Sequence, residues 1–78
     1  MSDEDVKEVA NEFISYCLEN EYGFDVRYNR FIEHLSLIIQ KDNFSYMRVL
    51  DEYELSDIKD KMSDLFDRMR EAFVAEKK

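Results

Sequence analysis

The chain has no proline and no tryptophan, a single glycine, Gly23, and a single cysteine, Cys17. Tight hairpins depend on glycine, proline and asparagine, so the shortage of turn residues argues against strands joined by short turns. A single cysteine excludes an intramolecular disulfide, and with one histidine it provides too few ligands for a structural zinc site. The sequence therefore predicts a helical fold that needs no disulfide, metal or cofactor.

Long apolar runs are also absent, and none approaches the ~20 residues that a membrane span needs. The composition is 45% hydrophobic and 38% charged, which is too apolar for a disordered chain. The acidic N-terminus is unlike a signal or transit peptide, and the lone free cysteine suits a reducing compartment, so we expect a cytoplasmic protein. The 78 residues predict one domain, 1–78, with a small core that association into a homodimer would help to stabilise.

Basic residues are in the minority, and the formal net charge is −8. The two ends of the chain are acidic, while the middle is slightly basic. Nucleic acid phosphates and anionic membrane surfaces attract clustered lysine and arginine. The charge therefore predicts no direct nucleic acid partner and no membrane partner.

The apolar residues recur at intervals of three and four, which is the spacing of amphipathic helices. We therefore expect an all-α fold, a small bundle of about four helices. Ser2 is a suitable N-cap for the first helix, and Gly23 is a suitable C-terminal stop. The expected helices span about 3–21, Asp25 to Lys41, Phe44–Glu54, and from Ser56 towards the C-terminus.

The only histidine, His34, lies in the segment VRYNRFIEHLSLIIQK with three of the 11 lysine and arginine residues. On a helix that turns by ~100° per residue, Arg27, Arg30 and Lys41 fall within roughly 40° of His34. Nearby cations favour the neutral, nucleophilic imidazole and stabilise a phosphate bound to it. The pattern predicts that His34 accepts a phosphate that Arg27, Arg30 and Lys41 face. A boundary histidine beside cations that pair with acids of other helices is the alternative interpretation.

Two apolar residues of the same expected helix point away from its apolar face. Leu37 lies about 160° from the centre of that face, and Val26 falls on the same outward side. Isolated exposed leucines are common on monomers, but here they flank the histidine. Val26 and Leu37 are therefore the predicted dimer surface.

The segment YNRFIEHLSLIIQK resembles the first histidine-bearing segment of the phosphotransferase-system regulation domain (PRD). The preceding FISYCLENEYGFDV resembles the first helix of that family and the turn that follows it. The resemblance implies an all-helical, dimeric regulatory domain whose histidine, here His34, receives phosphate from a phosphocarrier protein and so switches transcription or antitermination. No residue corresponds to the family's second histidine. The residues that match the family pattern are Tyr28, Arg30, Phe31, His34, Leu35, Leu37, Gln40 and Lys41.

A second functional class is an acidic protein that binds a basic partner. Glu4, Glu8 and Glu12 follow one another at intervals of four, so an isolated helix is slightly weakened by their repulsion. A basic partner surface would offset that cost, as it does for an inhibitor, an immunity protein or a nucleic acid mimic. A solvated face that aids solubility explains the same spacing without a partner.

The sequence offers little for an enzyme. It contains no glycine-rich phosphate loop and no His/Cys/Asp/Glu cluster with ligand spacing. Cys17 lies on the apolar stripe of the first expected helix, which favours a buried core residue over a nucleophile paired with His34. We therefore predict no catalytic residue and no metal ligand.

Overall fold

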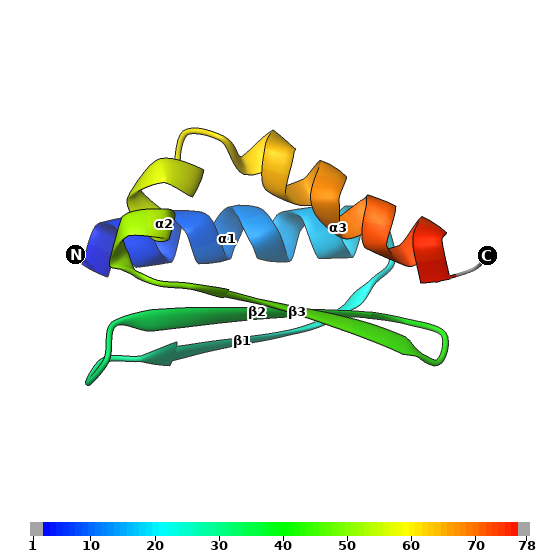
Figure 1. Ribbon diagram of the computed structural model, residues 1–78, viewed down its shortest axis with the longest axis horizontal. Coiled ribbons are helices and arrows are strands. Elements are labelled where there is room, and N and C mark those ends of the chain that lie inside the picture. The colour runs from blue at the N-terminus through cyan, green and yellow to red at the C-terminus, as the bar shows by residue number, and fades with distance from the viewer. Residues whose placement is uncertain (1–2, 77–78) are drawn as a thin grey trace.

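The computed structural model describes residues 3–76, with side chains described up to Ala72. The strands form one antiparallel sheet in the order β1-β2-β3, and the helices lie together on one side of it (Figure 1). The described part of the chain is therefore an α+β fold, and the expected all-α bundle of four helices is wrong. Its elements are α1 (Asp3–Glu19), β1 (Gly23–Asn29), β2 (His34–Lys41), β3 (Phe44–Leu50), α2 (Glu52–Ile58) and α3 (Met62–Glu76).

The second and third expected helices are replaced by the sheet. In β2, Leu35, Leu37 and Ile39 are fully buried, and the residues between them are more exposed. This alternation has the period of a strand. The helical interpretation grouped Leu35 with Ile38 and Ile39 instead. The segment Leu35–Ile39 fits the period of a strand and that of a helix because four of its five residues are apolar. Such short apolar runs do not distinguish a strand from a helix.

The turns form without glycine at their critical positions. Glu21, Glu33 and Asp42 adopt positive φ angles of 59°, 54° and 57°. The β1–β2 turn is closed by Asn29, whose Oδ1 accepts hydrogen bonds from the backbone N–H groups of Phe31 (3.0 Å) and Ile32 (3.2 Å). A left-handed conformation costs a non-glycine residue roughly 1–2 kcal/mol, which sheet pairing and helix packing offset here.

The helices at the two ends of the chain are closer to expectation. The first was expected over 3–21, and α1 covers Asp3–Glu19, which confirms the helix. Cys17, expected on its apolar stripe, is buried there together with Val9 and Phe13. The helix expected from Ser56 is interrupted: α2 begins earlier, at Glu52, and ends at Ile58, and α3 begins at Met62. Asp51 caps α2 by accepting a hydrogen bond from the backbone N–H of Glu54 at 2.8 Å.

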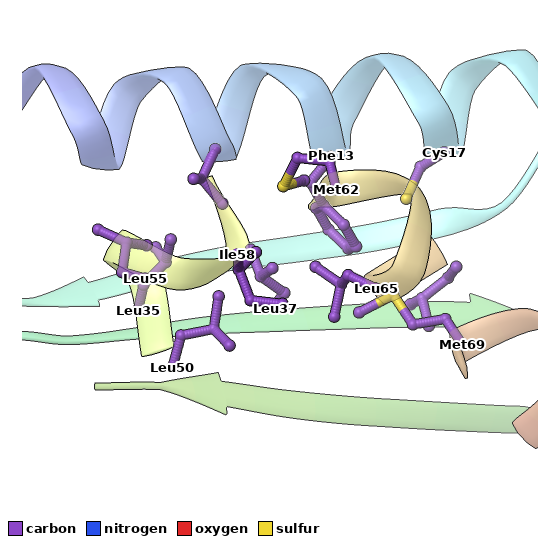
Figure 2. Packing of buried hydrophobic residues seen from close by; sticks show 12 residues of the cluster. Phe13, Cys17, Leu35, Leu37, Leu50, Leu55, Ile58, Met62, Leu65 and Met69 are labelled. Atoms are coloured by element: carbon purple, nitrogen blue, oxygen red, sulfur yellow. The ribbon is translucent and has the colours of Figure 1, made fainter. Parts of the chain in front are cut away.

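One hydrophobic core lies between the helices and the sheet. Figure 2 shows the side chains of Leu35, Leu37 and Leu50 directed from the strands towards those of the helices. β2 is the central strand, so β1 and β3 flank it within the sheet and the helices cover its inner face. The core residues are Val9, Phe13, Cys17, Leu35, Leu37, Ile39, Leu50, Leu55, Ile58, Met62, Leu65 and Met69.

The strand register leads to a stability prediction at Leu37. Replacing this fully buried side chain, Leu37→Ala, leaves a cavity and should lower the free energy of unfolding by about 2–5 kcal/mol. Gln40→Ala alters an exposed side chain of the same strand and should change the free energy of unfolding by less than about 0.5 kcal/mol. Urea unfolding followed by circular dichroism measures both, and equal midpoints for the two variants would contradict the register.

Candidate functional site

The structure places His34 at the start of β2, opposite Asn29 of β1. It is half-buried and lies on the sheet face turned away from the helices, since its neighbour Leu35 points into the core. Arg27 lies opposite Ser36, so it is a diagonal neighbour of His34 on the same face. Its guanidinium forms an ion pair with Asp25 at 3.2 Å.

The other two expected phosphate-facing cations lie elsewhere. Arg30 is in the β1–β2 turn, where it forms an ion pair with Asp3 at 2.9 Å. Lys41 ends β2, and its Nζ lies 5.3 Å from the ring centroid of Tyr22. Seven residues of strand separate Lys41 from His34, or ~23 Å, and the two side chains point to opposite faces. The expected cationic stripe does not form because these residues are in a hairpin.

The stripe of cations that suggested phosphorylation of His34 is therefore not formed. Phosphorylation of His34 stays a prediction. The all-helical domain that the PRD resemblance implies is also contradicted by the sheet. The predicted dimer surface is wrong, because Leu37 is fully buried and Val26 is half-buried against the core. A helix would direct Leu37 outward and Ile38 into the core. The strand directs Leu37 into the core and Ile38 to the opposite face.

Cys17 is a core residue. Its side chain is fully buried between α1 and the sheet, and desolvation raises the pKa of its thiol to about 11. A thiol in such surroundings is a poor nucleophile. Among the described residues, no group of three or more His, Cys, Asp or Glu side chains is placed to hold a metal ion.

This burial predicts the chemistry of Cys17. Thiolate formation should be roughly 100-fold lower in the folded chain than in the unfolded chain at pH 8, because the pKa rises by about two units. A thiol reagent should therefore label Cys17 only after denaturant is added. Since the unfolded thiol ionises first, the free energy of unfolding should fall as the pH rises from 9.0 to about 11. The variant Cys17→Ala should lack this part of the pH dependence.

The acidic residues expected to face a partner are exposed along α1. At ~100° per residue, Glu4, Glu8, Glu12 and Glu19 fall within an arc of roughly 80° on the side of α1 away from its buried residues. We call these four residues the acidic row. Among the described side chains, no lysine or arginine forms an ion pair with the acidic row, whereas Asp3 and Asp5 are paired with Arg30 and Lys59.

An open hollow of about 410 Å³ borders the acidic row between α1 and α3. Its lining includes Glu12 and Glu19 together with the rings of Tyr16 and Phe66, which stack in parallel with centroids 4.0 Å apart. Burial, and then the neighbouring Tyr22, raise the pKa of Tyr16, so its ring stays neutral at physiological pH. Carboxylates beside an aromatic face form a site suited to the side chain of arginine or lysine.

A second acidic hollow lies between α1 and α2 and is lined by Asp5, Glu52, Tyr53, Ser56 and Asp57. Two of its carboxylates already have cations, because Asp5 pairs with Lys59 at 3.2 Å and Asp57 pairs with Lys61 at 3.3 Å. An incoming cation would compete with these pairs. The hollow beside the acidic row is therefore the stronger candidate.

Three residues of this site, Glu19, Tyr16 and Phe66, were not predicted from the sequence. Glu19 follows Glu12 by seven residues, which is two helical turns, so the periodicity that grouped Glu4, Glu8 and Glu12 also contained it. Tyr16 and Phe66 come from different helices, and no spacing pattern indicates their contact. The aromatic part of the site depends on the tertiary fold alone.

Comparison of the chain with protein-family models, with curated proteins and with solved structures gives no significant match. None of the described helices is both long and apolar enough to cross a membrane.

Proposed function

We propose that this chain is a protein-interaction module that binds a basic segment of a partner through the acidic row and the adjoining hollow. The observation that carries the proposal is the position of Glu12 and Glu19 beside the stacked rings of Tyr16 and Phe66. Neither carboxylate has an ion-pair partner among the described side chains. The site thus combines an aromatic surface with carboxylates that have no ion-pair partner among the described side chains. The cation that acts on Tyr16, Arg70, is itself paired with Asp67 at 3.1 Å.

The spacing of the site favours a segment with several cations. Glu12 and Glu19 are seven residues apart on α1, which corresponds to ~10 Å along the helix. Two basic side chains at alternate turns of a partner helix, or three residues apart in a polyproline II segment, lie on one face and match this separation. Arginine suits the hollow better than lysine because its planar guanidinium stacks on aromatic rings and pairs with a carboxylate at the same time.

The expected affinity is modest and depends on salt. An exposed ion pair contributes about 0.2–1 kcal/mol, and a cation over an aromatic face contributes about 0.5–2 kcal/mol. Several such contacts are needed for micromolar binding, after the cost of association is included. Since the carboxylates are exposed, added salt should weaken the complex strongly.

An arginine-rich peptide tests the charge part of the proposal. The double variant Glu12→Gln/Glu19→Gln should weaken peptide binding by roughly five- to tenfold, since it removes two ion pairs of about 0.5–0.7 kcal/mol each. Fluorescence anisotropy of the labelled peptide at low and high salt measures the effect. The double variant Asp42→Asn/Asp60→Asn removes two exposed carboxylates outside the hollow and should leave binding within about twofold. Equal losses for the two double variants would show that only net charge matters.

The aromatic part of the site has its own test. The variant Phe66→Leu keeps an apolar side chain but removes the stack with Tyr16. The wild-type chain should bind an arginine peptide more tightly than a lysine peptide of equal length, and the variant should lose about half or more of that preference. A preference that survives in Phe66→Leu would remove the aromatic pair from the binding site.

A further inference from the structure

The outer edge of β3 is open for pairing. The sheet order β1-β2-β3 leaves one long side of β3 without a neighbouring strand among the described residues. β3 spans seven residues, FSYMRVL, and contains no glycine, proline, lysine or acid. Natural edge strands avoid association through such residues or through bulges. This edge has only Arg48 as a charged residue, and Arg48 is paired with Glu54 at 2.8 Å.

The residues of β3 on the open face, the sheet face turned away from the helices, are also exposed to solvent. Met47 is 59% exposed and Val49 is 39% exposed, although both belong to a well-paired strand. They lie opposite Ile38 and Ser36 of β2, so this side of the sheet carries an uncharged, partly apolar strip. The other edge strand differs, since β1 carries Asp25 and Arg27 on the same face. Of the two edges, β3 is therefore the one suited to pairing.

Self-pairing of β3 has one favourable register. If two copies pair antiparallel about a two-fold axis perpendicular to the sheet, each residue lies opposite one of the same face. An axis at Met47, the middle of Phe44–Leu50, pairs the whole strand and sets Arg48 opposite Tyr46 of the second copy. An axis at Arg48 would oppose like charges, and an axis at Tyr46 would extend the pairing into the Asp42 turn.

The distribution of acids permits this contact despite the net charge of −8. α1, which carries the acidic row, packs over β1 and β2, whereas α2 and α3 pack over β3. The acidic row therefore lies on the part of the molecule away from the open edge. The exposed side chains described for α3 include Arg68 and Arg70 as well as acids, so the helix above β3 has a mixed charge.

We propose that two copies of this chain pair antiparallel through the outer edges of β3, about a two-fold axis at Met47, and so join their sheets into one. The occupant of the edge is a second copy because the strand is complementary to itself in charge and in face. Met47 then lies beside Met47 of the second copy and Val49 beside its Ser45, and the free backbone groups of both edges form hydrogen bonds. The contact is separate from the acidic row and does not rest on the proposed function.

Cysteine cross-linking tests the register. In an antiparallel pair, directly opposed Cα atoms lie about 4.5–5.5 Å apart, which is within the range of a disulfide. Met47→Cys should therefore form a disulfide with itself under mild oxidation of the folded protein. Ser45→Cys should not, because its copies lie four residues out of register, or ~13 Å. A mixture of Ser45→Cys and Val49→Cys should cross-link, while the wild-type chain with its buried Cys17 should not.

Light scattering tests the dimer without cross-links. The wild-type chain should have twice its mass of 9.5 kDa, and Val49→Lys should have the mass of one chain. Gln40→Lys adds the same charge to the same face on the central strand and should remain a dimer. A monomeric wild type, a Val49→Lys variant that stays dimeric, or Ser45→Cys cross-linking as readily as Met47→Cys would each overturn the proposal.

Discussion

The structure depends on the burial of one face of the central strand. Leu35, Leu37 and Ile39 of β2 are fully buried, and the helices each pack against this side of the sheet. Because side chains alternate along a strand, fixing these three inward also fixes His34 and Ile38 on the open face. The same constraint turns the apolar side of α1 towards the sheet and leaves its acidic row in solvent. A slip of one residue in β2 would expose the core and bury the only histidine.

The sequence predicts those parts of the fold whose pattern has one interpretation. The long amphipathic stretch of α1 fits only a helix, so the helix, its buried Cys17 and its exposed Glu4, Glu8 and Glu12 were predicted from the sequence. The hairpin was missed for two reasons. The Leu35–Ile39 run fits the period of a helix as well as that of a strand. The turns on either side of β2 use Asn29, Glu33 and Asp42 in place of glycine. Backbone conformations that are unfavourable for the isolated residue are selected by tertiary packing, which composition does not reveal.

His34 was predicted to have the wrong neighbours because the segment that forms β2 was assigned the period of a helix. A helix brings together residues three, four and seven apart, and that rule grouped His34 with Arg27, Arg30 and Lys41. A hairpin instead brings together residues at equal distances from the turn, so Asn29 is the neighbour of His34. The aromatic pair of Tyr16 and Phe66 is a contact of the opposite kind, since fifty positions of sequence separate residues that stack at 4.0 Å. Local spacing neither predicts such a pair nor argues against it.

The two proposed surfaces are compatible with one assembly. A two-fold axis perpendicular to the joined sheet keeps the helices of both copies on the same side, so both acidic rows would face one partner. Linking two weak sites raises the apparent affinity for a partner that reaches both, without any new contact. Since each exposed ion pair contributes little, this gain matters more here than at a tight interface. A partner with two basic segments at the separation of the two α1 helices would then be selected over one with a single basic segment, although the chemistry at each hollow is the same.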